Sequence, residues 1–459
     1  MTEMATGVAP PAPVELVAKE ATIEIQDTVA VVDSSVEEND VEKEIKLSAS
    51  SSNSKKSRDL LRLAFGYTCA FSCVTLAVGA MPLVFTSTGG SDSASPLTLA
   101  FFFLGSSFIS LVTSKIFLKL GRRTGFIIGN SLGILGGILG ALAVYFQLPA
   151  LVVVASFPLG MSNGIGLYIR YAAMELVPEE EKAFAMTLVL SGGCASAFLG
   201  PESGELTKDI FGDDYTYLGL YLCIVAFNIL GALSVGFVSF PPMKQMEVDV
   251  EGGTGQKSAK EILKETPFVG PTLIAGLSWT LMLVPMSIAR VAMKEVGFAS
   301  RESLLTLELH FLSMYSPGFF SGRMIGHIGA YHSSALSIFL LLSGMVINLC
   351  VTDSTSAVWI IGLLFLGSGW NIGFSSATVL LSKTYAENPG YGPYVQAVND
   401  FVMFGMTGCA VVSAGFIYTA GGEGISGWQL LNVVVAVGLL PFLYLVVPGL
   451  MKERQAKKQ

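Results

Sequence analysis

The stretch PALVVVASFPLGMSNGIGLYI, residues 149–169, decides the fold class, because no charged side chain occurs along its whole length. A helix of about 20 apolar residues crosses the ~30 Å hydrocarbon core of a bilayer. Residues 125–147 and 355–382 are equally free of charge. Three such runs predict a helical integral membrane protein.

The composition agrees with this prediction. The chain of 459 residues is 52% apolar and only 14% charged, and its mean hydropathy is +0.62. A soluble protein typically carries about 25% charged residues. The six cysteines lie inside apolar runs without neighbouring histidines or carboxylates, so we expect no metal site and no cofactor.

Residues 1–57 differ from the rest of the chain. They contain eleven acidic residues, five lysines and no aromatic residue, and they account for most of the net charge of −8. This composition is typical of a disordered acidic tail. The segment lacks the features of a signal or transit peptide, so it assigns the chain to no particular membrane.

The apolar segments predict twelve transmembrane helices arranged as two six-helix halves. We expect these at residues 60–86, 96–118, 125–147, 149–175, 183–203, 217–240, 268–290, 303–325, 328–351, 355–382, 393–419 and 428–451. The predicted domains are therefore the tail 1–57, the halves 58–240 and 268–451, the linker 241–267 and the end 452–459.

Lysine and arginine gather on one side of this arrangement. They occur before residue 63, at 119–123, in the linker and after residue 451, whereas the opposite loops hold only Lys208, Lys294 and Arg301. Because basic residues favour cytoplasmic loops, we expect both termini and the linker to be cytoplasmic.

A short internal repeat supports the two halves. FPLGMSNGIG at 157–166 parallels FLGSGWNIGF at 365–374, about 208 residues later, and each copy places an asparagine between glycines in the middle of a predicted span. Glycine permits close approach of helix backbones in a membrane.

The loop SKIFLKLGRRTG at 114–125 resembles the signature loop of the major facilitator superfamily, with Gly121, Arg122 and Arg123 in the expected places. The second half keeps Gly322 and Arg323 in GFFSGRMIGHIGA, residues 318–330. The acidic residues of the signature are absent from both loops. The resemblance implies a fold of two six-helix halves, and the missing acids place the usual charge relay in doubt.

Longer stretches extend the resemblance over residues 60–450. YIRYAAMELVPEEEKAFAMTLVLSGGCASAFLGPE, HFLSMYSPGFFSGRMIGHIG and GWNIGFSSATVLLSKTYAENPGYGPYVQAVNDFVMFG are similar to a group of bacterial permeases, some described as riboflavin-type vitamin transporters. GPESG at 200–204 also resembles a signature of proton-driven antiporters. The resemblance implies transport, while the substrate is left open because one scaffold carries many solutes.

Ionisable residues inside predicted spans are functional candidates, because a charge in hydrocarbon needs a partner. They are Arg170, Glu202, Glu308, His310 and Asp400. Glu308 and His310 lie near the predicted midplane and could carry a coupling proton. The alternative is a histidine bonded to a neighbouring backbone carbonyl or hydroxyl group. Glu202 lies near the outer face, as a gate residue or as a solvated one.

Asn163, Asn371 and Trp370 fall in the spans that line the central cavity of this fold. The two amides could bind a polar substrate or join helices by hydrogen bonds. The Trp370 ring could stack on a substrate ring or pack against a helix or lipid.

Arg170 has three possible roles. Its long side chain could reach the cytoplasmic interface, it could bind an anionic group of the substrate, or it could pair with Asp400 as an inner gate that opens during transport.

The sequence therefore predicts a secondary active transporter of a small organic solute, with alternating access and proton coupling as symport or antiport. The expected partners are the solute, the lipid bilayer and protons, and no nucleic acid. A transporter-like sensor that acts through the tail is the alternative. An enzyme is not expected, since the chain has no phosphate-binding loop and no paired catalytic motif.

Overall fold

The computed structural model describes residues 54–178, 181–241, 259–387 and 392–456. The chain divides into two units, Met1–Arg58 and Asp59–Gln459. Most of the expected tail 1–57 and most of the linker 241–267 lie outside the described residues.

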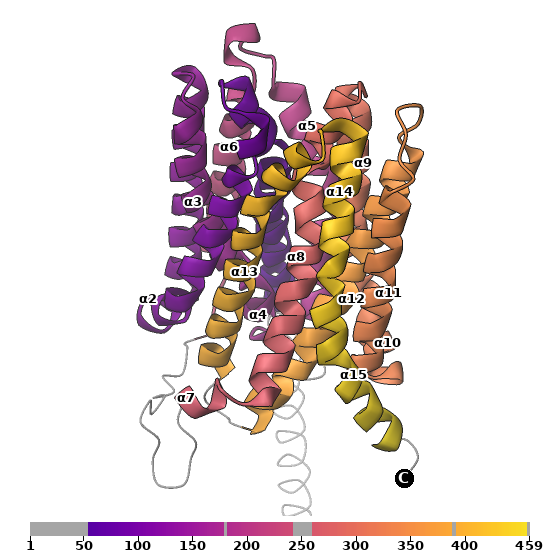
Figure 1. Cartoon of the computed structure of the whole chain (residues 1–459). Helices are drawn as coiled ribbons and strands as arrows, with labels where there is room; N and C mark the ends of the chain where they lie inside the picture. The colour runs from indigo at the N-terminus through magenta and orange to yellow at the C-terminus, as the bar shows by residue number, and fades with distance from the viewer. Residues whose placement is uncertain (1–53, 179–180, 242–258, 388–391, 457–459) are drawn as a thin grey trace, which may run out of the picture. The chain divides into compact units, whose positions relative to one another are not determined.

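Every regular element within the described ranges is a helix (Figure 1). The first is the helix Ser54–Ser87. It is followed by η1 (Asp92–Ala94), α2 (Leu97–Tyr145), α3 (Pro149–Gly166), α4 (Ile169–Met174), α5 (Lys182–Thr207), η3 (Asp213–Tyr215), α6 (Leu218–Gly236), α7 (Ala259–Ile262), α8 (Thr266–Glu295), α9 (Ser300–Tyr315), α10 (Gly318–Ile328), α11 (Ala330–Asn348), α12 (Ala357–Glu387), α13 (Gly392–Ala420), α14 (Gly424–Val437) and α15 (Leu439–Ala456).

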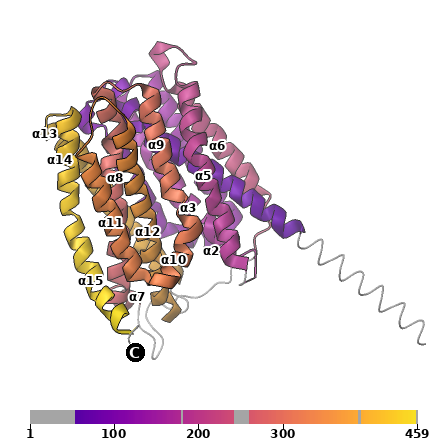
Figure 2. The ribbon, with the colours of Figure 1, turned by 90° about the vertical axis from the view of Figure 1, so that its right-hand side faces the viewer.

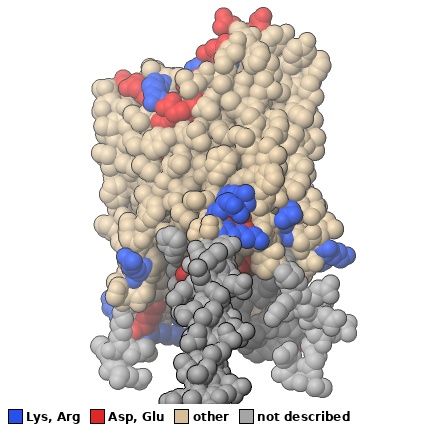
Figure 3. Space-filling view, turned by 180° about the vertical axis from the view of Figure 1, so that it is seen from behind, with Lys and Arg blue, Asp and Glu red and all other residues tan. Residues whose placement is uncertain are grey.

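The protein is a multi-pass membrane protein. Within the described residues, nine helices are long and apolar enough to cross a bilayer: Ser54–Ser87, Asp92–Tyr145, Pro149–Met174, Leu218–Gly236, Thr266–Glu295, Ala330–Asn348, Ala357–Thr384, Tyr394–Ala420 and Gly424–Gln455. On the face shown in Figure 3, charged side chains gather towards the two ends, and a broad band between them carries none. Such a band suits contact with hydrocarbon.

The nine helices differ from the twelve expected spans in two places. Two expected spans, 96–118 and 125–147, both lie within α2, where a kink at Gly121 separates them. The expected spans 183–203 and 303–325 are helical but are not among these nine apolar helices. They correspond to α5, α9 and α10, which all contribute to an internal cavity and carry polar side chains. The count of twelve stays a prediction.

Glycine breaks α2 at the signature loop. Gly121 has φ 80° and ψ 163°, whereas the rest of α2 is helical. Gly329, between α10 and α11, has the closely similar values of φ 101° and ψ 154°. Both values lie in a region that favours glycine. The same sharp change of direction therefore occurs about 208 residues apart, at the spacing of the sequence repeat.

Helices α2 and α3 are held together by a close backbone contact. A Cβ atom added at Gly160 would lie 1.7 Å from the carbonyl oxygen of Phe102. Ser106 Oγ donates a hydrogen bond to the carbonyl oxygen of Gly160 at 2.8 Å, and Asn163 Nδ2 donates to Ser106 Oγ at 3.0 Å. The small residue and the polar side chains together replace the hydrophobic driving force that is absent between helices in lipid.

Segments far apart in the sequence also pack together. Helix α2 contacts α13, where Ser107 Oγ donates to the carbonyl oxygen of Phe401 at 2.8 Å. Helix α5 contacts α9, as Figure 2 shows from the side. These contacts join the two predicted halves along both sides of the cavity.

We expect Gly160→Ala to destabilise the protein, because the added methyl group would collide with the backbone of α2. Overpacking of this kind costs about 1–3 kcal/mol. The melting temperature in detergent should therefore fall. Gly270→Ala in α8 is the matched control, because no atom lies within 4 Å of the added Cβ. Equal melting temperatures for the two variants would contradict the close contact.

Candidate functional site

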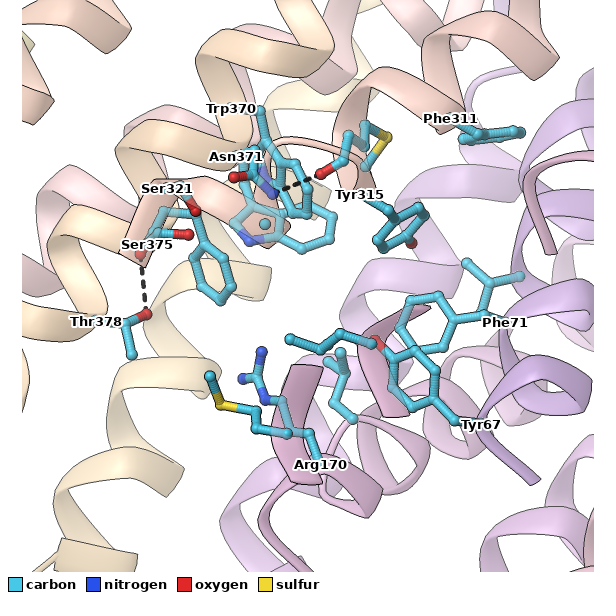
Figure 4. A pocket seen from close by; sticks show the side chains of 18 of the residues that line it. Tyr67, Phe71, Arg170, Phe311, Tyr315, Ser321, Trp370, Asn371, Ser375 and Thr378 are labelled. Atoms are coloured by element: carbon cyan, nitrogen blue, oxygen red, sulfur yellow. Dashed lines mark hydrogen bonds between the residues drawn. The ribbon is translucent and has the colours of Figure 1, made fainter. Parts of the chain in front are cut away.

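A cavity of about 240 Å³ lies among the helix Ser54–Ser87, α4, α5, α8, α9, α10 and α12 (Figure 4). Aromatic side chains form much of its wall. They are Tyr67, Phe71, Phe103, Tyr171, Trp279, Phe311, Tyr315, Phe319, Trp370 and Phe374. Apart from the tyrosines, Arg170 is the one ionisable side chain among the described residues that line this cavity.

The aromatic rings of the cavity wall pack against one another. Trp370 and Phe374, one turn apart on α12, stack with their planes 8° apart and their centroids 5.6 Å apart. Trp279 of α8 meets Trp370 edge to face at 4.8 Å. Tyr315 meets Trp370 edge to face at 6.3 Å and Phe71 edge to face at 5.5 Å. Such contacts restrict ring rotation, so the cavity presents fixed aromatic surfaces.

All four expected substrate-binding residues, Asn163, Arg170, Trp370 and Asn371, line this cavity. Asn163 is engaged with Ser106. Asn371 Nδ2 donates to the carbonyl oxygen of Met314 at 2.6 Å, while its Oδ1 has no hydrogen-bond partner among the described residues. Trp370 Nε1 also has no hydrogen-bond partner among the described residues. A buried donor and a buried acceptor are thus available side by side.

The Arg170 guanidinium is surrounded by rings rather than by carboxylates. Its Nη2 donates to Tyr171 Oη at 3.1 Å, and its Cζ lies 4.8 Å from the centroid of the Tyr171 ring and 5.7 Å from that of Phe374. Its Nε is buried and has no partner within the part of the chain that the structure describes. The first of the three accounts, an escape to the membrane interface, therefore does not fit this conformation.

Asp400 lies close to Arg170 but does not pair with it. Both side chains line a second, much smaller cavity together with Gln396 and Asn399. Asp400 is 5% exposed, and its Oδ1 accepts a hydrogen bond from Asn399 Nδ2 at 3.0 Å. Among the described ion pairs within 4.0 Å, none joins Arg170 to Asp400.

Glu308 and His310 are both buried, but they face different neighbours. Glu308 Oε1 lies 4.0 Å from Arg301 Nη1, whereas His310 Nδ1 lies 2.7 Å from the carbonyl oxygen of Leu363 on α12. Residues two apart on a helix do not face each other. The structure therefore does not bring these two candidates together, and neither of them lines the cavity.

A charged cluster, which we define as Glu202, Glu205, Arg290 and Arg301, lies between α5, α8 and α9. Arg301 Nη1 lies 2.6 Å from Glu202 Oε1, and Arg290 Nη2 lies 4.0 Å from Glu205 Oε2. Arg290 Nη1 also donates to the carbonyl oxygen of Gly79 at 3.0 Å. Glu202 is thus paired rather than simply solvated.

The signature residues have separate partners at the other end. Arg122 forms a two-pronged ion pair with Glu175 and lies over the Phe117 ring at 4.6 Å. Arg123 Nη2 donates to the carbonyl oxygen of Val238 at 2.8 Å. Glu175, at the end of α4, supplies an acidic partner that the loop itself lacks.

The corresponding motif of the second half is largely helical, because residues 318–328 form α10. Gly322 lines the cavity. Arg323 is exposed and has no hydrogen bond or ion pair within the described residues. The two motifs are therefore not equivalent in their contacts.

Three residues with partners in the structure were not predicted from the sequence: Arg290, Glu205 and Glu175. All three lie at or beyond the ends of predicted spans, where a charged side chain ordinarily contacts water. The signal was nevertheless present for Arg290, which directly follows the apolar run 271–289. The aromatic lining was missed because rings are common throughout membrane spans.

We expect the buried Arg290 to keep the cavity closed at the end where the charged cluster lies. Thr75 lines both the main cavity and a small cavity beside Arg290. In a variant without native cysteines, Thr75→Cys should react slowly with an impermeant thiol reagent applied from that end. Adding Arg290→Met should raise the rate at least about tenfold, because a charged hydrogen bond is worth about 1.5–3 kcal/mol.

Arg301→Met is the matched control for this measurement. The Arg301 side chain is 59% exposed, so its ion pair should contribute little. A larger effect from Arg301→Met than from Arg290→Met would contradict the assignment.

Comparisons with known proteins show which proteins this chain resembles. The family model described as Major Facilitator Superfamily matches residues 63–399. The riboflavin transporter RfnT of Brucella anthropi is 28% identical over 388 residues, which cover 82% of this chain and 94% of that protein.

Solved structures share the fold at low sequence identity. The xylose transporter XylE of E. coli matches with a TM-score of 0.62 and 14% identity, covering 85% of this chain and 98% of that one. The fucose:proton symporter FucP of E. coli matches with a TM-score of 0.57 and 17% identity, covering 85% and 99%.

Proposed function

Because the chain belongs to the Major Facilitator Superfamily and is a transporter rather than an enzyme, we propose that it is a secondary active transporter of a small organic solute that binds in the aromatic cavity. The observation that carries this proposal is the cavity itself, which is lined by helices from both ends of the sequence. Such a location suits alternating access, in which one part of the protein rocks against the other around the site.

The proposed architecture is two six-helix halves, residues 58–240 and 268–451. Two pairs of residues support this architecture. Gly121 and Gly329 share the spacing of the sequence repeat, and so do Asn163 and Asn371. With the charged cluster closed, the cavity is available to the solute from the end that holds α4 and α10. This is one of the two states that alternating access requires.

A planar ring is the solute feature that the cavity fits best. Trp370 and Phe374 offer parallel faces, and stacking is favourable for any aromatic ring. The name of the Brucella relative supports the same class, because riboflavin contains a planar ring system. Uptake of radiolabelled riboflavin, other vitamins, organic anions and cationic drugs into vesicles tests the proposal. Transport of none of them would contradict it.

Proton coupling through Glu308 is the second part of the proposal. A buried carboxylate beside Arg301, at the contact between α5 and α9, could link its own protonation to the opening of the charged cluster. His310 lies within the same helix but is bonded to Leu363, so we give it the lesser role. Symport and antiport both remain compatible with this position.

We expect Glu308→Gln to abolish accumulation against a gradient while solute exchange continues, because the glutamine cannot lose a proton. The measurement is pH-driven uptake compared with counterflow in the same vesicles. Glu302→Gln, at the exposed start of the same helix, is the control and should leave both unchanged. Normal accumulation by Glu308→Gln would rule out this carboxylate as the coupling group.

The proposed orientation places both termini and the linker in the cytoplasm. We expect a cysteine at position 255 to be unreactive towards an impermeant reagent outside intact cells. A cysteine in place of the exposed Asp214, at the opposite end, should react readily. The reverse pattern would overturn the orientation.

A further inference from the structure

The Arg170 guanidinium carries a positive charge into a cavity that contains no carboxylate among its described lining residues. Figure 4 shows this side chain projecting into the open space towards Trp370 and Asn371. Tyr171 Oη is its hydrogen-bond acceptor, and Nε has no partner among the described residues. A cation in a low-dielectric site without an opposite charge is costly, so the site favours an anion.

Asp400 is the charged group that faces Arg170 from another element. It lies on α13, beyond the main cavity, and it lines only the smaller cavity that both residues share. Its Oδ1 is engaged by Asn399 Nδ2, and no ion pair with Arg170 is formed. Asp400 thus leaves the face of Arg170 that meets the main cavity available to a ligand.

The remaining polar atoms of the cavity lie on α12. Trp370 Nε1 can donate a hydrogen bond and Asn371 Oδ1 can accept one, and both side chains are more than nine-tenths buried. Phe374, whose ring stacks on Trp370, also lies 5.7 Å from the Arg170 guanidinium. A ring lying along this aromatic surface would therefore have the cation at its edge.

We infer that the transported solute is a planar aromatic acid, whose carboxylate or phosphate binds Arg170 while its ring lies against Trp370 and Phe374. The inference rests on the proposed transport function and names the substrate class of the same site. The planar guanidinium can donate two parallel hydrogen bonds to either kind of anion. Trp370 Nε1 then donates a hydrogen bond to a polar atom on the ring, and Asn371 Oδ1 accepts one from another.

The test uses probes that differ in charge but hardly in shape. Isothermal titration calorimetry on the purified full-length protein compares 2-naphthoate with 2-naphthamide, and naphthyl phosphate distinguishes phosphate from carboxylate. We expect the acid to bind about tenfold or more tightly than the amide, as a charge-assisted hydrogen bond implies. In Arg170→Gln this preference should disappear while the affinity for the amide stays within about twofold.

Two further variants separate charge from folding. Arg170→Lys keeps the charge but not the planar fork, so it should retain a reduced preference for the acid. Arg323→Gln removes an exposed arginine from α10 and should leave the preference unchanged. The amide affinity of Arg170→Gln shows that the cavity is still formed.

Equal binding of acid and amide to the unaltered protein, or no binding of either, would overturn the inference, as would an acid preference that survives in Arg170→Gln. These results differ from a failure of the proposed function. A protein that transports neutral riboflavin but does not prefer the acid retains its transport function, whereas one that binds naphthoate but moves no solute does not.

Discussion

The structure depends on one constraint, which is that a polar group inside the bilayer must find its partner within the protein. Backbone groups meet this constraint by forming helices. Side chains meet it between helices, as Ser106 does with Gly160 and Asn163, and as Ser107 does with Phe401. Because each such bond joins two helices, the polar residues determine which helices pack together.

The cavity is one place where this constraint is only partly met. Trp370 Nε1, Asn371 Oδ1 and Arg170 Nε lack partners among the described residues, although they lie in or beside the most apolar part of the molecule. Some buried ions elsewhere are paired, as Arg122 is with Glu175. An arrangement that leaves several polar atoms unpaired at one point is stabilised when a ligand supplies their partners. Arg170, Trp370 and Asn371 also line an open space that a ligand can occupy.

The sequence predicted the helical class and the positions of many elements because both follow from apolar length. The charge-free run 149–169 became α3 and the start of α4, and Gly121, in the signature loop, became the break in α2. Asn163 and Asn371, which lie in the repeated segments, both line the cavity. The positions of the helices and of the break at Gly121 depend on residues close in the chain.

Partner choice could not be predicted in the same way. Glu308 and His310 are two residues apart in sequence, yet Glu308 lies near Arg301 of its own helix and His310 contacts α12, because a helix turns by about 100° per residue. Glu175 and Arg122 are far apart in sequence and meet only when α4 returns to the loop. Such pairs depend on the relative rotation of packed helices, which hydropathy does not encode.

The bond from Arg290 to the carbonyl oxygen of Gly79 has a consequence for the divergence of related proteins. The acceptor is a main-chain atom, so no substitution at position 79 can remove it. A larger residue there would place its Cβ 2.8 Å from Leu307 Cδ2, so the Leu307 side chain would have to shift. Substitution at this contact is therefore limited at position 79 by the size of the side chain and at position 290 by the need for a hydrogen-bond donor. Related proteins could exchange the surrounding aliphatic residues and still keep the hydrogen bond between Arg290 and the main chain of residue 79.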